Sequence, residues 1–158
     1  MASVETPKGM KDFLPEEQIV RQGLIDKLKV IFEKYGFSPL ETPAIEMLSV
    51  LNAKGGGGTA IGKEIFTLTD RAGRELGLRF DQTVPLSRCF AQNQLPIPFK
   101  RYQIGKVFRE EFGNKNREFI QCDIDTLGSI SPIADAEIIA VLQNFFDEIG
   151  LDVIIKVN

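Results

Sequence analysis

KRYQIGKVFREEFGNKNREFIQCDIDTLG, residues Lys100–Gly128, is the stretch that decides the fold, because it is typical of two strands joined by a short charged loop. In its second half, apolar Ile120, Cys122 and Ile124 alternate with other residue types. A period of two predicts a strand with one face in the core and the other toward water or a polar ligand. That second face carries Phe119, Gln121, Asp123 and Asp125.

Two arginines frame the loop between these predicted strands, Arg109 before it and Arg117 after it. A guanidinium group presents a fork of donors that suits a phosphate or a carboxylate. A polar residue on a strand face is most often simply solvated, and Arg109 could equally be the ion-pair partner of Glu111. The joint pattern, rather than any single residue, therefore indicates a binding site.

The composition is that of a globular protein, and we predict that residues 1–158 form a single domain. The net charge of -3 argues against binding nucleic acid through bulk charge. The sequence has no apolar run long enough to cross a membrane and no signal-peptide pattern at its N-terminus, so we expect a cytoplasmic protein. With no histidine, and with Cys89 and Cys122 far apart, we expect no metal site and two buried thiols.

Apolar spacing and turn residues predict the remaining elements. Helices are predicted over residues 16–35, 45–54, 84–93 and 133–150, and strands over 64–69, 76–83 and 152–157. The prolines Pro39 and Pro43 favour an extended segment between the first two helices.

The glycine run Gly55–Gly58 invites a phosphate-loop interpretation, because residues 57–63 nearly match the pattern G-x-x-x-x-G-K. The match fails because Glu64 stands where the magnesium-binding hydroxyl belongs and no buried strand precedes the run. A flexible loop is the favoured interpretation, and the role of these glycines stays open.

Three predicted strands carry polar side chains that would converge if the strands share a sheet. Asp81 and Thr83 belong to one, Arg109 to the next, and Gln121 and Asp125 to the third. Carboxylates and an amide suit an ammonium group, whereas arginine suits a phosphate. Such a pocket fits an amino acid beside a nucleotide.

Several stretches resemble a known family. RYQIGKVFREE with NREFIQCDIDTLG is similar to motif 2 of class II aminoacyl-tRNA synthetases, and within them to the histidyl-tRNA synthetases. LRFDQTVPLSR resembles that family's histidine-binding stretch, and PKGMKDFLP with ETPAIE resembles its N-terminal lead and motif 1. The resemblance implies an α+β fold, an antiparallel β-sheet flanked by helices of the class II catalytic-core type. The core would be incomplete, since motif 3 and the anticodon-binding domain have no counterpart.

The resemblance also implies which residues bind ATP. Arg109 would be the catalytic residue, holding the α-phosphate and stabilising the charge that develops there during adenylation. Glu111 would lie near the adenine, Phe119 would stack under it, and Arg117 would add a second contact. The loop is shorter than is usual in the family, and Lys115 stands near an expected arginine.

Histidine recognition is implied at a second set of residues. Asp81, Thr83 and Gln121 would hold the α-amino group of histidine, and Asp125 would help to accept its imidazole. Pro43 would lie at the interface of a homodimer.

These likenesses imply a fragment of a histidine–tRNA ligase, which activates histidine with ATP and transfers it to tRNA when complete. Mg²⁺ is expected to accompany ATP, with no ligands assigned in this chain. The isolated 158 residues are expected to be inactive. One alternative is a non-catalytic relative, like the histidine-sensing regulatory subunit of ATP phosphoribosyltransferase, and another is a structural or dimerisation module.

Overall fold

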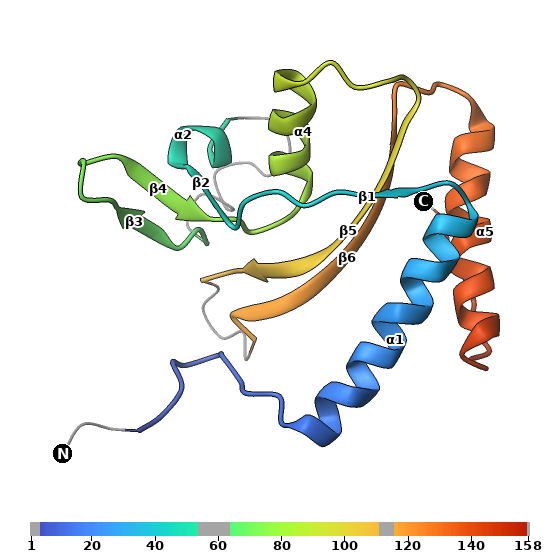
Figure 1. Cartoon of the computed structure of the whole chain (residues 1–158), viewed down its shortest axis with the longest axis horizontal. Helices are drawn as coiled ribbons and strands as arrows, with labels where there is room; N and C mark the ends of the chain where they lie inside the picture. Colours follow the sequence, from blue (N-terminus) through green and yellow to red (C-terminus); the bar gives the residue numbers. More distant parts are fainter. Residues whose placement is uncertain (1–3, 54–63, 111–115, 158) are drawn as a thin grey trace. The chain divides into compact units, whose positions relative to one another are not determined.

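The fold is α+β, as predicted, and its helices and strands are shown in Figure 1. The computed structural model describes residues 4–53, 64–110 and 116–157. The elements in chain order are α1 (Pro15–Lys34), β1 (Ser38–Pro39), β2 (Ile45–Met47), α2 (Leu48–Leu51), β3 (Thr67–Thr69), β4 (Glu75–Leu78), α4 (Thr83–Gln92), β5 (Phe99–Phe108), β6 (Glu118–Leu127) and α5 (Pro132–Glu148). They form two compact units. Unit 1 comprises residues 1–12, 41–94 and 104–122, and unit 2 comprises 13–40, 95–103 and 123–158.

Unit 1 contains an antiparallel sheet in the order β2-β4-β3, with Ile45 opposite Leu78 and Thr67 opposite Gly77. Its core consists of three buried apolar residues, Leu51, Ile65 and Phe80, with Leu48 and Val84 packed against them. Gly77 allows this packing, because a Cβ there would lie 2.8 Å from both the Leu51 and the Ile65 side chains.

Unit 2 is built on the packing of α1 against α5 and of α1 against β5. The ring centroids of Phe32 and Tyr102 lie 5.4 Å apart, and Val141 of α5 is fully buried. Ser131 accepts a hydrogen bond from the Ile133 amide at 3.3 Å, so the predicted start of α5 is confirmed.

The long hairpin of β5 and β6 is confirmed, and each of its strands contributes residues to both units. The sheet order is β1-β5-β6, and β1 pairs with β5 in parallel through Ser38 and Arg101. The expected antiparallel pairing is present in the β2-β4-β3 sheet, and this two-residue parallel pair occurs in addition to it.

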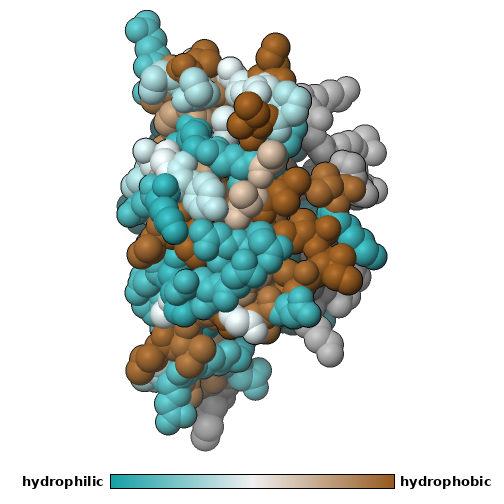
Figure 2. All heavy atoms as spheres, turned by 90° about the vertical axis from the view of Figure 1, so that its right-hand side faces the viewer, coloured by the Kyte–Doolittle hydropathy of each residue, from teal (hydrophilic) through white to brown (hydrophobic). Residues whose placement is uncertain are grey.

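One helix prediction needs correction. Residues 45–54 were predicted as one helix, but the range begins with strand β2, and among its described residues, 45–53, only Leu48–Leu51 is helical. The apolar spacing of α1 does not mark a uniformly buried face, since Ile31 and Phe32 are buried whereas Ile19 is 71% exposed. Figure 2 shows hydrophobic residues at the surface on the side of the molecule where α1 and α5 lie in Figure 1.

The strand predicted over residues 152–157 is wrong, because the described residues 151–157 have no strand geometry. A backbone needs a pairing partner to form a strand, and no pairing with this segment occurs in the described part of the chain. The prediction of buried thiols is also wrong: Cys122 is exposed and Cys89 is only half-buried.

No helix in the described ranges has the length and apolar character needed to cross a membrane.

Candidate functional site

Arg109 follows the end of β5 and joins two parts of unit 1. Its Nε donates to the carbonyl oxygen of Phe80 at 3.0 Å, and its amide donates to the Arg117 carbonyl at 3.0 Å. The guanidinium carbon lies 5.1 Å from the ring centroid of Phe119, within the range of a cation–π contact. Arg109 therefore lies beside the residue that precedes Asp81 and beside the ring of Phe119.

Asp81 and Thr83 were predicted on a strand, and this placement is wrong. Strand β4 ends at Leu78, and Thr83 is the first residue of α4. One carboxylate oxygen of Asp81 accepts a hydrogen bond from the Val84 amide at 3.0 Å. A carboxylate that satisfies an amide in the first turn of a helix favours helix initiation over continuation of the strand.

Gln121 is half-buried on β6, and its main chain is tied to the Asp81–Thr83 segment through Gln82. The Gln82 side chain is fully buried, and its Nε2 donates to the carbonyls of Gly105 and Gln121, both at 3.1 Å. Sequence reasoning missed Gln82, whose position between two candidate residues is the one signal that the sequence offers.

Arg79 and Arg88 of the same stretch have internal hydrogen-bond partners. The buried Arg79 donates to the carbonyls of Lys106 and Thr42, each at 2.8 Å. Arg88 donates hydrogen bonds to both carboxylate oxygens of Glu46 at 2.7–3.0 Å. Through these bonds, both arginines hold the segment of residues 79–88 to Thr42, Glu46 and Lys106.

Arg117 immediately precedes β6 and is held by several neighbours. Its Nη2 donates to a Glu110 carboxylate oxygen at 3.0 Å, and its guanidinium carbon lies 5.1 Å from the Phe66 ring centroid. Its amide donates to the Gly9 carbonyl at 2.7 Å. The predicted ATP contact Glu111 lies outside the described residues, as do Lys115 and the glycines at 55–58.

Two further predicted residues are Asp125 and Pro43. Asp125 belongs to unit 2, where its carboxylate forms an ion pair with the fully buried Arg101. Pro43 is exposed and follows the buried Thr42.

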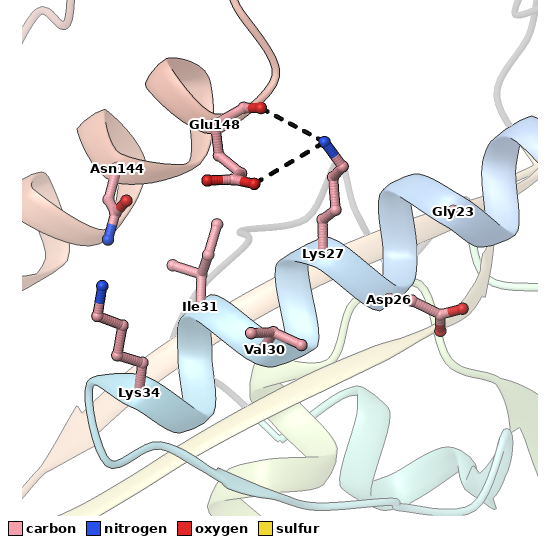
Figure 3. A pocket seen from close by; sticks show the side chains of 8 residues that line it. All are labelled: Gly23, Asp26, Lys27, Val30, Ile31, Lys34, Asn144 and Glu148. Atoms are coloured by element: carbon pink, nitrogen blue, oxygen red, sulfur yellow. Dashed lines mark hydrogen bonds and ion pairs between the residues drawn. The ribbon is translucent and has the colours of Figure 1, made fainter.

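Unit 2 also contains hollows, of which two have a well-defined lining. One, of about 350 Å³, is lined partly by Asp125, Thr126 and Ser131. The other, of about 410 Å³, lies between α1 and α5, where Lys27 contacts the Glu148 carbonyl at 3.4 Å and its carboxylate at 4.0 Å (Figure 3). None of the predicted site residues lines the second hollow.

Four residues of unit 1, Arg109, Phe119, Asp81 and Gln121, carry a guanidinium, an aromatic ring, a carboxylate and an amide. The guanidinium lies against the ring, and hydrogen bonds to main-chain carbonyls link the Asp81 segment to Arg109 and to Gln121. We call these four residues with Thr83 the candidate site. Its groups suit an anionic phosphate at the arginine and an ammonium group at the carboxylate. Across the described ranges, no cluster of three or more histidine, cysteine, aspartate or glutamate side chains has a metal-binding arrangement.

Comparison with known proteins adds independent findings. A family model described as histidyl-tRNA synthetase matches residues 9–157. Histidine–tRNA ligase 1 of Bacillus cereus is 45% identical over 161 aligned positions, which cover 100% of this chain and 38% of the relative. The chain thus spans well under half the length of this curated relative.

Two solved structures are similar in fold. The histidyl-tRNA synthetase of a Nostoc species is 40% identical with a TM-score of 0.80, covering 92% of this chain and 34% of that one. A Bacillus halodurans protein described as an ATP phosphoribosyltransferase regulatory subunit/histidyl-tRNA synthetase is 28% identical, also with a TM-score of 0.80. That match covers 96% of this chain and 40% of the other.

Proposed function

The chain belongs to the histidyl-tRNA synthetase family, and from this premise we propose that it is the N-terminal part of the catalytic domain of a histidine–tRNA ligase. Residues 1–158 would form one partial domain that carries motifs 1 and 2. The complete protein would use ATP to activate histidine and would transfer it to tRNA. We further propose that it works as a cytoplasmic homodimer, with the exposed Pro43 at the interface.

The observation that carries this proposal is the arrangement around Arg109. Its guanidinium is anchored on the Phe80 carbonyl and lies against the Phe119 ring. An ATP adenine stacked on Phe119 would leave the α-phosphate near the arginine. Arg117 and Glu111 would complete the ATP contacts.

Histidine would bind at the carboxylate and amide groups. Asp81, Thr83 and Gln121 would receive its α-amino group, and Asp125, fixed by its ion pair with Arg101, would accept its imidazole. The ammonium group would meet an acceptor that is already positioned, because Asp81 is held by the Val84 amide.

The reaction needs no nucleophile from the protein. An oxygen of the histidine carboxylate would attack the α-phosphorus, a new P–O bond would form, and the bond to the bridging oxygen would break as pyrophosphate leaves. Negative charge would build up on the phosphoryl oxygens, where Arg109 would stabilise it. The tRNA hydroxyl would then attack the adenylate carbonyl and release AMP. Mg²⁺ would bind with ATP and neutralise part of its charge.

The test is histidine-dependent exchange of pyrophosphate into ATP, followed by tRNA charging, in the full-length protein that contains this chain. We expect exchange with histidine, none with other amino acids, and charged tRNA as the product. Absence of exchange with a folded, ATP-competent protein would contradict the proposal.

A second candidate is a histidine-sensing subunit without ligase activity, favoured by the 28% identity to the Bacillus halodurans protein. It predicts histidine binding in calorimetry with no adenylate and no charged tRNA. The same two assays therefore separate the two functions.

A further inference from the structure

We propose that Gln82 is a positioning residue for histidine, which sets the candidate site's Asp81 and Thr83 at a fixed distance from Gln121. This inference rests on the proposed function, because it concerns how the amino-acid end of that site keeps its shape. Gln82 itself is buried and would touch no substrate.

The Gln82 side-chain amide makes two hydrogen bonds to the hairpin. Its Nε2 donates at 3.1 Å to the carbonyl of Gly105 on β5 and at 3.1 Å to the carbonyl of Gln121 on β6. One side chain thus joins the start of α4 to both strands of the hairpin. Gln82 is 0% exposed, so its amide is shielded from water, while the two acceptor residues are half-buried.

The space around the Gln82 amide is tight. A Cβ at position 105 would lie 3.3 Å from Gln82 Nε2 and 2.6 Å from Arg79 Nη2. The glycine therefore lets both side chains approach the strand backbone. To make the same two hydrogen bonds, a different side chain at residue 82 would need both the length and the N–H donor of glutamine.

Loss of the two Gln82 bonds would act on the residues that these bonds hold in place. Asp81 and Thr83 are the chain neighbours of Gln82, and Gln121 is held through its own carbonyl. All three are proposed contacts of the histidine ammonium group. Arg109 contacts Phe119 directly. It also bonds the carbonyl of Phe80, but Phe80 is part of the buried core of unit 1, so the ATP end keeps support that does not depend on Gln82. Loss of the Gln82 bonds should weaken histidine binding much more than ATP binding.

If Gln82 only stabilised the fold, its replacement would lower the melting temperature and raise the KM values for histidine and ATP equally. Gln82 Oε1 is buried and has no hydrogen-bond partner among the described residues. The substitution Gln82→Met keeps the side-chain length and removes this unpaired acceptor, which offsets part of the stability cost. Stability and histidine affinity can therefore change independently.

The experiment measures KM for histidine and for ATP by pyrophosphate exchange in the full-length protein, with the melting temperature of each variant. For Gln82→Met we expect the histidine KM to rise about tenfold, which corresponds to about 1.4 kcal/mol, and the ATP KM to stay within about twofold. The control is Gln92→Met on the same helix, where the residue is exposed and accepts from Arg88 at 2.9 Å. It should match the unsubstituted protein.

A second variant, Gln82→Glu, makes the histidine KM depend on pH, and it keeps the inference testable if Gln82→Met does not fold. Only a protonated carboxyl can donate to a carbonyl, so its histidine KM should fall as the pH is lowered, relative to the unsubstituted protein. A folded variant with unchanged histidine KM, or with both KM values raised equally alongside a lower melting temperature, would overturn the inference. If the unsubstituted protein showed no histidine-dependent exchange, the proposed function itself would fail, and this inference with it.

Discussion

Arg109 is the residue on which the proposed chemistry depends most. Its guanidinium keeps two neighbours, the Phe80 carbonyl and the Phe119 ring, so it is pre-positioned before any ligand binds. Pre-positioned charge stabilises a transition state without reorganisation at the moment of reaction.

Replacement of this side chain gives the first prediction. Arg109→Ala in the full-length protein should lower the rate of pyrophosphate exchange by about 10²–10³-fold, by analogy with loss of one oxyanion-type donor. The matched control is Arg71→Ala, which removes an exposed arginine in the turn between β3 and β4. Exchange at the unsubstituted rate in a folded Arg109→Ala protein would remove the assigned role.

Tyr102 supplies a prediction about pH. Burial, and then the 2.7 Å hydrogen bond to Glu33, raise the pKa of Tyr102 from 10.0 to about 12. Between these values the unfolded chain has lost the phenolic proton while the folded chain keeps it. The folded state then binds more protons, so the free energy of unfolding should fall as the pH rises from about 10 to about 12.

Melting temperatures between pH 9 and pH 12 check this. Tyr102→Phe should remove this part of the pH dependence, whereas Tyr35→Phe, at the chain's other tyrosine, should keep it. Equal slopes in all three proteins would show that Tyr102 is not the titrating group.

At the scale of elements, the buried pair of Arg88 on α4 and Glu46 on β2 fixes the helix that begins with Thr83. The Glu46 side chain is 6% exposed and the Arg88 side chain 21%. Removing one member of a buried pair leaves the other charged and without its counter-ion.

We therefore expect Arg88→Met to lower the free energy of unfolding by about 3 kcal/mol. The control Arg74→Met breaks the exposed pair with Asp70 in the β3–β4 turn and should change stability little. Chemical denaturation of the full-length protein measures both. A loss in Arg88→Met no larger than in the control would mean that this pair does not hold α4.

The elements also show what the sequence could predict. The hairpin from Lys100 to Gly128 and the two long helices α1 and α5 were recoverable, because period and capping residues act locally. The strand-to-helix change before Thr83 was not, because Asp81 bonds the Val84 amide instead of continuing the alternation. Exposure of Cys122 was also missed, since alternation identifies two faces of a strand but not what covers each face.

The candidate site was predictable only in part. Arg109 and Phe119 stood out by residue type, and the structure places them in contact. Gln82 and Arg79 did not, because their importance lies in hydrogen bonds to carbonyls of residues more than twenty positions away. Sequence patterns carry almost no signal for such bonds.

On the scale of the whole molecule, the chain covers 38% of the length of its Bacillus cereus relative. We propose that the candidate site carries groups for both histidine and ATP, and that catalysis also needs the remaining length of the full protein. We expect the isolated 158 residues to show negligible histidine-dependent exchange beside the full-length protein measured at equal concentration. A matching rate from the isolated chain would contradict this expectation.

The most direct measurement is a crystal structure of the full-length protein with ATP and the alcohol analogue of histidine, which cannot react. We expect the ammonium group of the analogue within hydrogen-bond distance, about 3 Å, of Asp81 and Gln121, with the α-phosphate at the guanidinium of Arg109. A structure in which both ligands are bound and these three side chains contact neither of them would contradict the proposed site.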